Sequence, residues 1–365
     1  MSIIIFFIVL LVLVMVHEAG HFFAAKISKM RVEEFAFGFP PKLFGKKVGE
    51  TLYAFNALPI GGYVKITGEG FEEEDRARLK NDKKAFQNRP RILQLFVLSA
   101  GVIMNLVLAV VIFSFVYTRP HYISTSDPDY GYRVNNPHIV VVGVSPNSPA
   151  QEAQINPGDV ILKMYTAKAS AKLDSATSVI DFVKTHNEES ITVVYQKPDA
   201  GKISTTTLSA VYGLVDGRKS LGFAVDYAGE VSLPAHMAFV KAISDTGKFT
   251  WMTIAGLGDI IQKLWNGENV MNTLAGPVGI AKMVGGASEA GLVTLLTFVA
   301  VLSINLAVFN ALPIPALDGG RILFVLIEAV IRRPLNYKFQ YWANSISFLL
   351  LIGLILTTTF FDIFR

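Results

Sequence analysis

Four long apolar runs without a charged residue set the pattern of the chain. They cover residues 1–16, 92–118, 290–317 and 339–361, and the first continues to residue 25 with only three ionisable side chains. A helix of about 20 residues crosses the hydrocarbon core of a bilayer. The pattern therefore predicts four transmembrane helices.

Residues 31–67 contain short apolar and aromatic runs that glycine and proline interrupt. Such runs predict strands, and we expect a β-hairpin or a small sheet. The segment is too apolar for a free loop, so we expect it to dip back against the membrane helices. A hairpin resting at the membrane surface is the alternative.

The long segment between the second and third runs predicts a separate α+β domain. We expect strands at 139–144, 191–196 and 204–211 and a helix at about 175–186. This order resembles a PDZ domain, a module that binds extended peptide ends at a sheet edge. Residues 230–289 then predict amphipathic helices on the outer membrane surface. The PDZ-like signature consists of Ser148-Pro149-Ala150 and Pro157-Gly158-Asp159-Val160-Ile161.

Composition narrows the class of protein. With 52% hydrophobic and 17% charged residues, the chain is too apolar for an ordinary soluble protein. The net charge of +4 is modest, and we expect no nucleic-acid partner. Because the chain has no cysteine, disulfides and thiol catalysis are excluded, and any metal needs His, Asp or Glu ligands.

Basic residues in the loops predict the orientation. Residues 26–91 hold fourteen Lys and Arg against nine Asp and Glu, whereas residues 119–230 hold ten against twelve. The positive-inside rule places the first loop in the cytoplasm and the middle segment and both termini outside. We expect the first run to be a retained helix rather than a cleaved signal peptide, because no basic residue precedes it.

The most informative polar residues lie at the end of the first run. His17, Glu18 and His21 form a His-Glu-x-x-His motif. On a continuing helix, two histidines four residues apart project from one face, as two ligands of a single zinc ion must. Glu18 is then placed to take a proton from a water molecule. Ionisable groups in a membrane span are costly and usually mark a function, which argues against purely structural His and Glu residues.

Asp318 is the expected third ligand. The third run ends at Pro313 and Pro315, which cannot continue a helix, so the backbone must unwind just before Asp318. The first and third spans run in the same direction, so Asp318 and the two histidines arrive at similar depth. Catalytic zinc typically has three protein ligands and one open position. The alternatives are that Asp318 only caps a helix, or that Glu328 is the ligand.

Together these motifs resemble the site-2 protease family of intramembrane zinc metalloproteases, closest to the bacterial regulator of sigma-E protease type. The resemblance covers nearly the whole chain. It departs from the family pattern at Val102, where proline is usual, and in a single PDZ domain where some relatives have two. We expect Gly101 and Asn105 to serve the packing of helices. The remaining motifs are Gly61-Gly62-Tyr63-Val64-Lys65, Gly276-Pro277-Val278-Gly279, and Asn310-x-x-Pro-x-Pro-x-x-Asp318-Gly319.

The resemblance implies an activity and a set of residue roles. The family cleaves transmembrane helices of single-pass proteins, notably anti-sigma factors already trimmed by another protease, and remnant signal peptides. The resemblance further implies a PDZ domain that excludes substrates with bulky outer domains. The implied roles are one zinc ion held by His17, His21 and Asp318, Glu18 as catalytic base, and Asn310 and more weakly Asn305 as contacts to the substrate backbone.

A substrate helix must unwind before its peptide bonds can be cut. Each freed backbone group then needs a new partner, because an unpaired one in lipid costs several kcal/mol. We expect the hairpin edge at Gly62, Tyr63 and Val64 to supply such partners by strand addition.

We therefore predict a polytopic α-helical membrane protein of the bacterial plasma (inner) membrane. It has four transmembrane helices, a membrane-associated β-hairpin or sheet and one extracytoplasmic PDZ domain of the α+β class, with its active site towards the cytoplasmic side. The expected boundaries are 1–28, 91–118, 290–331 and 339–362 for the spans, 29–67 for the hairpin region, 68–90 for a charged cytoplasmic segment, 119–229 for the PDZ domain, 230–289 for the interfacial segment and 332–338 for a cytoplasmic loop.

Two other functions compete with proteolysis. A catalytically silent membrane scaffold would use the PDZ domain to recruit partners, but it has no reason to keep Glu18 beside two ligands. A metal transporter would need further polar residues along the second and fourth spans, where they are almost absent.

Overall fold

The chain folds into two compact units, and each is described by itself. The first comprises residues 1–114, 239–288 and 295–365, and the second comprises residues 115–238 and 289–294. The computed structural model describes residues 2–70, 78–124, 135–145, 147–197, 201–215, 218–268, 270 and 275–364. Part of the predicted charged segment, residues 71–77, therefore lies outside the described residues.

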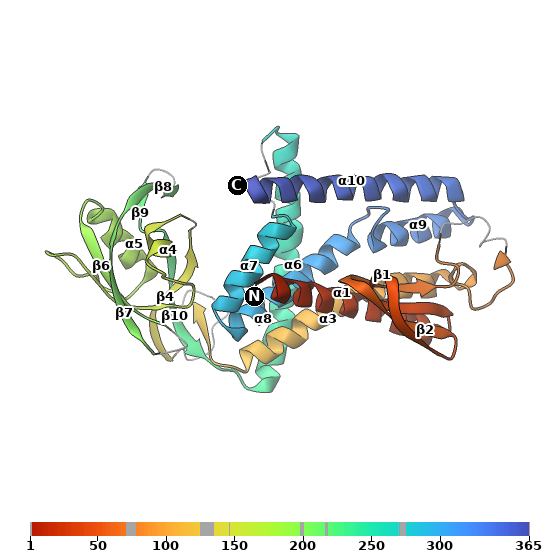
Figure 1. The fold of residues 1–365 in the computed structure, drawn as a ribbon, viewed down its shortest axis with the longest axis horizontal. Coiled ribbons are helices and arrows are strands. Elements are labelled where there is room, and N and C mark those ends of the chain that lie inside the picture. Colours follow the sequence, from red (N-terminus) through yellow and green to blue (C-terminus); the bar gives the residue numbers. More distant parts are fainter. Residues whose placement is uncertain are drawn as a thin grey trace. The chain divides into compact units, whose positions relative to one another are not determined.

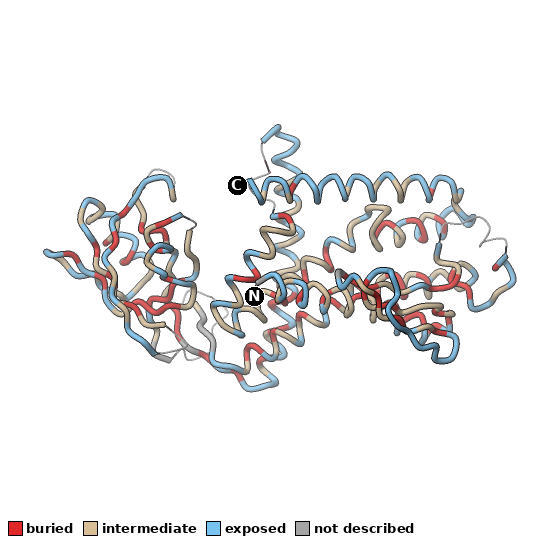
Figure 2. The backbone as a smooth tube through the Cα atoms, viewed as in Figure 1, coloured by how far each residue is buried: buried red, intermediate tan, exposed pale blue. Residues whose placement is uncertain are grey.

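Four helices of the described chain are long and apolar enough to cross a membrane, as predicted. Their outward side chains are large and apolar, and Figure 2 shows exposed residues along most of α10. In water such a surface would be strongly unfavourable, whereas lipid solvates it. The protein is therefore a membrane protein. The four helices are α1 (Ser2–Ile27), α3 (Arg91–Tyr117), α8 (Leu292–Ala311) and α10 (Tyr337–Phe364).

Helix α1 lies in close contact with α3. A Cβ atom at Gly20 would lie 2.8 Å from the carbonyl carbon of Ala100, so only glycine permits this approach. Towards its other end, α1 packs through Val9 and Leu13 against Val299 of α8. These contacts hold the first, second and third spans together around the motif of α1.

The β-structure predicted between the first two spans is present. Strand β1 (Val32–Val48) pairs with β2 (Thr51–Ile66) along two stretches. The first part of β1 lies between residues 52–55 and residues 62–66 of β2. The second part of β1 pairs with residues 51–56 of β2. Residues 62–66 therefore form one edge of the sheet. The sheet lies against α1, where the Phe22 and Phe35 ring centroids are 5.1 Å apart (Figure 1).

The third apolar run is broken, as Pro313 and Pro315 predict. Helix α8 ends at Ala311, and α9 (Asp318–Ile331) begins after a tight connection. A Cβ atom at Gly320 would lie 2.5 Å from the Cα atom of Pro315, so this glycine lets α9 fold back onto the connection. The break places Asp318 in the first turn of α9.

Two further helices precede α8. Helix α6 (Ala235–Trp265) runs across the direction of α1 and α3 (Figure 1), and its Phe249 ring stacks on Phe113 of α3 at 5.6 Å. Helix α7 (Pro277–Glu289) begins at the Gly-Pro-Val-Gly motif, where the Gly279 N–H donates to the Asp362 carboxylate of α10 at 2.7 Å. The motif thus ties α7 to the last turn of α10.

The second unit is a six-stranded antiparallel sheet in the order β3-β10-β4-β5-β6-β7, with helix α5 (Ala176–Thr185). The predicted strands at 139–144, 191–196 and 204–211 and the predicted helix are all present. Ile139, Met164 and Ile191 are fully buried at its centre. The remaining elements are β3 (His121–Ser124), β4 (Asn135–Val144), α4 (Pro149–Glu152), β5 (Val160–Tyr165), β6 (Ser190–Gln196), β7 (Ile203–Ser209), β8 (Val211–Val215), β9 (Arg218–Ser220) and β10 (Phe223–Val231).

Candidate metal and catalytic site

Three side chains predicted as ligands converge in the first unit. The Oδ2 atom of Asp318 lies 2.9 Å from Nε2 of His17 and 3.1 Å from Nε2 of His21. The two Nε2 atoms are 3.2 Å apart, and both histidines are buried. Among the described residues this is the one cluster of three such side chains with metal-binding geometry.

The donor set suits zinc. Zinc takes nitrogen and oxygen ligands at about 2.0–2.2 Å in a tetrahedron, which puts neighbouring ligand atoms roughly 3.3 Å apart. The three observed separations, 2.9, 3.1 and 3.2 Å, are close to that value. Two imidazoles and one carboxylate leave a fourth position open, as in catalytic rather than structural zinc sites.

Helix α3 contacts both histidines at their Nδ1 atoms, on the side of each ring away from Asp318. The Nδ1 atom of His21 lies 2.8 Å from the Val97 carbonyl oxygen, and Nδ1 of His17 lies 3.3 Å from the Asn105 side-chain amide. Between them, a Cβ atom at Gly101 would lie 2.6 Å from the His17 ring. The expected role of Gly101 and Asn105 in helix packing does not include these contacts with the histidines. The four-residue spacing of Val97, Gly101 and Asn105 does place the three residues on one face of a helix, and this is the feature of the sequence that could have indicated a shared contact.

Glu18 lies at the junction of two cavities. Together with Asp318 it lines a cavity of about 220 Å³ that also contains Tyr63, and another of about 210 Å³ that also contains Asn310. Its Oε2 atom accepts a hydrogen bond of 3.0 Å from the Val64 N–H, at the edge of the sheet. A carboxylate in this position can exchange protons with a water molecule or a substrate amide beside the three ligands.

The two predicted asparagine contacts differ in position. Asn310 lines the cavity beside His17 and Asp318. Asn305 lines neither cavity, because it points towards α6 and its Oδ1 atom accepts a hydrogen bond of 2.8 Å from Thr253. The structure therefore brings Asn310 to the ligands and leaves Asn305 as a link between helices.

The predicted hairpin residues lie beside the ligands. Tyr63 and Val64 line the cavity with Glu18. Gly62 lies under α1, where a Cβ atom would come within 2.7 Å of the Met15 sulfur. The pKa of the Tyr63 phenol is raised above its ordinary value, mainly by burial and to a smaller extent by a hydrogen bond to Glu34. Tyr63 therefore stays neutral near pH 7 and can donate a hydrogen bond but cannot act as a base.

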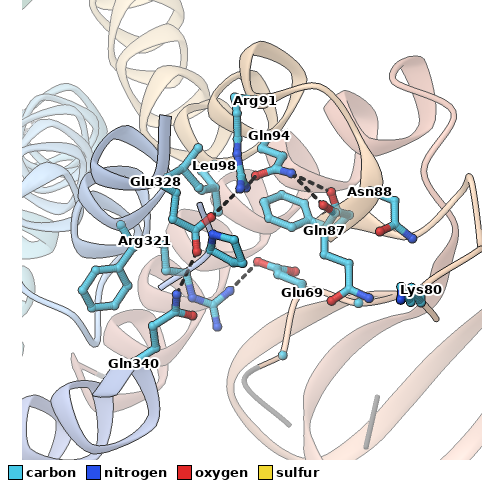
Figure 3. Close-up of a pocket in the computed structure, with 16 residues that line it drawn as sticks. Glu69, Lys80, Gln87, Asn88, Arg91, Gln94, Leu98, Arg321, Glu328 and Gln340 are labelled. Atoms are coloured by element: carbon cyan, nitrogen blue, oxygen red, sulfur yellow. Dashed lines mark hydrogen bonds and ion pairs between the residues drawn. The ribbon is translucent and has the colours of Figure 1, made fainter. Parts of the chain in front are cut away.

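A third cavity, which is polar and has a volume of about 320 Å³, adjoins the cavity that contains Tyr63, and Figure 3 shows its lining. An ion pair between Glu69 and Arg321 lines both cavities. At its other side, Glu328 pairs with Arg91 at 2.7 Å and accepts a hydrogen bond from Gln340 at 3.0 Å. Glu328 is thus committed to other partners and is not part of the ligand cluster. No motif in the sequence marks Glu69 or Arg321 as residues of the site.

Comparison with known proteins gives the same class of enzyme. Residues 5–354 match the model of Peptidase family M50. Relatives that carry the name "Putative zinc metalloprotease" include a Clostridium perfringens protein that is 38% identical, with 96% of this chain and 95% of the relative covered. A Synechocystis relative is 33% identical, with 95% of this chain and 90% of the relative covered. A Fusobacterium nucleatum relative is 31% identical, with 100% of this chain and 99% of the relative covered. The chain belongs to peptidase family M50, the site-2 protease family, and is a zinc metallopeptidase of the membrane.

Proposed function

We propose that this protein is an intramembrane endopeptidase that hydrolyses peptide bonds within transmembrane segments of single-pass membrane proteins. One observation carries the proposal: two histidines of a membrane-spanning helix and an aspartate of a broken helix meet beside a glutamate. Charged groups at such depth are costly, so their convergence favours a reaction site over a structural one.

In the proposed site, His17, His21 and Asp318 hold one zinc ion per chain. When bound, the ion would supply Lewis acidity, which polarises a peptide carbonyl and lowers the pKa of water to about 7. Glu18 takes a proton from the attacking water and delivers it to the leaving amine. Its hydrogen bond from Val64 orients the carboxylate for both transfers. General acid–base catalysis of this kind contributes roughly 10²- to 10⁴-fold in rate.

The substrate backbone requires partners on both sides of the scissile bond. The outer edge of the sheet at Gly62, Tyr63 and Val64 offers backbone groups to an added strand, and its Val64 N–H is already bonded to Glu18. On the other side, Asn310 provides a side-chain amide that can both donate and accept. This division supports an extended substrate held between the sheet edge and the end of α8.

We also propose that the second unit is a PDZ domain outside the cytoplasm, which binds peptide ends or excludes large substrates. A groove of about 220 Å³ runs between α5 and β10 and is lined by Val179, Lys184 and Phe223. Beyond β4, β10 pairs among the described strands only with β3, at residues 228–231, so residues 223–225 have no second strand beside them there. A free strand beside a helix is the arrangement that peptide-adding modules use.

The proposed setting is a bacterial plasma membrane, with the ligand cluster towards the cytoplasmic side and α6 on the outer surface. The distribution of basic residues supports this orientation. Anti-sigma factors already shortened by another protease and remnant signal peptides are the proposed substrates. Both are single helices with small outer parts.

Purified full-length protein tests the proposal in lipid vesicles with a single-pass reporter. Glu18→Gln should lower the cleavage rate at least about 10²-fold, because it removes the base. It should retain one zinc ion per chain, whereas Asp318→Ala should lose both zinc and cleavage. Unchanged cleavage by Glu18→Gln would contradict the mechanism. A zinc-loaded wild type that binds peptide ends but cleaves no reporter would instead favour the silent scaffold.

A further inference from the structure

We propose that Asn105 is a positioning residue that holds the His17 ring by accepting a hydrogen bond from Nδ1, so that the Nε2 lone pair points at the metal. This inference rests on the zinc site of the proposed function and adds a residue outside the ligand set. It assigns to α3 a role in metal binding beyond helix packing.

His21 illustrates how a hydrogen bond at Nδ1 holds a ligand histidine. Its Nδ1 atom lies 2.8 Å from the Val97 carbonyl oxygen, and a carbonyl can only accept a hydrogen bond. Nδ1 of His21 therefore carries the proton, and Nε2 presents a lone pair towards Asp318. In metal sites the second ring nitrogen is almost always held in this way, which fixes both the tautomer and the orientation of the ligand.

His17 needs an equivalent acceptor, and Asn105 is the side chain in place to supply it. Its amide lies 3.3 Å from Nδ1 of His17 and is completely buried. The amide nitrogen faces the ring in the structure, but the nitrogen and oxygen of an amide are interchangeable by a half-turn. Among the described residues the buried Oδ1 atom of Asn105 has no hydrogen-bond partner, so the half-turn breaks no bond of that oxygen. It brings an acceptor to the Nδ1 proton of His17.

The backbone around Asn105 is held firmly. The Ser303 hydroxyl of α8 donates a hydrogen bond of 2.8 Å to the Asn105 carbonyl oxygen. One turn earlier, a Cβ atom at Gly101 would lie 2.6 Å from Cε1 of His17, so the absence of a side chain lets α3 reach the rings. Val97, Gly101 and Asn105 are each four residues apart and form one stripe that serves both imidazoles.

Helix packing alone does not account for this asparagine. A leucine, which has the same number of side-chain heavy atoms, would fill this buried position without burying an unpaired oxygen, which costs about 1–3 kcal/mol. The polar side chain is explained when the oxygen has a protonated ring nitrogen to bind. Loss of such an outer contact typically lowers metal affinity by roughly 10- to 100-fold.

The test measures zinc affinity rather than cleavage. Full-length protein in detergent is stripped of metal, and the zinc dissociation constant is determined by competition with a chromophoric chelator. Asn105→Leu should weaken zinc binding roughly 10- to 100-fold. Asn105→Asp keeps an acceptor at the same place and should bind zinc at least as tightly as wild type. Ser114→Ala is the matched control on α3, because that hydroxyl donates to the Val110 carbonyl of its own helix at 2.6 Å.

Two results would overturn the inference. One is an Asn105→Leu protein that binds zinc as tightly as wild type, and the other is an Asn105→Asp protein that binds no better than Asn105→Leu. If Asn105→Leu does not fold, the comparison of Asn105→Asp with Asn105→Ala replaces it. A wild-type protein that binds no zinc would refute the proposed function itself, so the two failures are distinguishable.

Discussion

The carboxylate of Glu18 and the backbone of Val64 are joined by a hydrogen bond of 3.0 Å, in which the Val64 N–H donates to Oε2. The bond links the motif of the first span to the edge of the sheet, although 46 residues separate the two positions. It gives the edge strand two roles, since the N–H that holds the base also belongs to the edge proposed to accept substrate.

Val64→Pro removes this N–H and should slow cleavage while zinc remains bound, because no ligand is touched. The rate alone does not separate loss of substrate binding from disorientation of Glu18. The separation comes from a Glu18→Gln background, in which photo-crosslinking measures capture of the substrate. There Val64→Pro should capture less substrate than Val64→Ala, which keeps its N–H. Equal capture by the two variants would contradict strand addition.

Gly101→Ala should abolish zinc binding. The added Cβ atom would lie 2.6 Å from Cε1 and 2.7 Å from Nε2 of His17, so either the ring or α3 must move. Because two ligands lie under this one position, we expect a larger loss of affinity than for Asn105→Leu. Zinc content after dialysis measures the effect. Gly353→Ala is the control, because a Cβ atom there would meet nothing within 4 Å.

Glu328→Ala should lower stability without lowering the zinc content. The carboxylate pairs with Arg91 at 2.7 Å and accepts hydrogen bonds of 3.0 Å from Gln340 and from the Leu335 N–H. Arg91 is 36% exposed, so water compensates part of the loss and we expect roughly 1–2 kcal/mol.

The melting temperature in detergent measures the effect of Glu328→Ala. Glu328→Gln keeps an acceptor for Gln340, so its melting temperature should lie between those of the wild type and Glu328→Ala. Full retention of stability by Glu328→Ala would show that the ion pair between Glu328 and Arg91 is dispensable.

Gly222→Ala should disrupt the proposed peptide groove of the second unit. Gly222 has φ +88°, which side chains rarely adopt, and a Cβ atom there would lie 2.5 Å from the Ser148 hydroxyl. We expect a cost of at least about 1 kcal/mol and weaker binding of peptide ends, measured by calorimetry on the full chain. Cleavage of a reporter without an outer domain should stay at the wild-type rate. A fall in both activities would contradict a separate role for the second unit.

The sequence was sufficient for features that depend on local spacing. Four uncharged runs predicted four spanning helices, because length and apolarity alone decide whether a helix fits a bilayer. The spacing of His17 and His21 predicted a shared face, and the two prolines before Asp318 predicted a break in the third apolar run. These rules act within a few turns of one chain segment.

The tertiary structure decided which faces of the helices meet. Helices α1 and α8 are apolar on nearly all sides, so hydrophobic periodicity does not reveal which face turns towards α3. Only the packed structure shows Asn105 behind His17, Val64 on Glu18 and Asn305 turned away towards Thr253. In lipid the apolar effect does not orient helices, so close packing and a few polar contacts determine their arrangement, and neither can be read from one sequence.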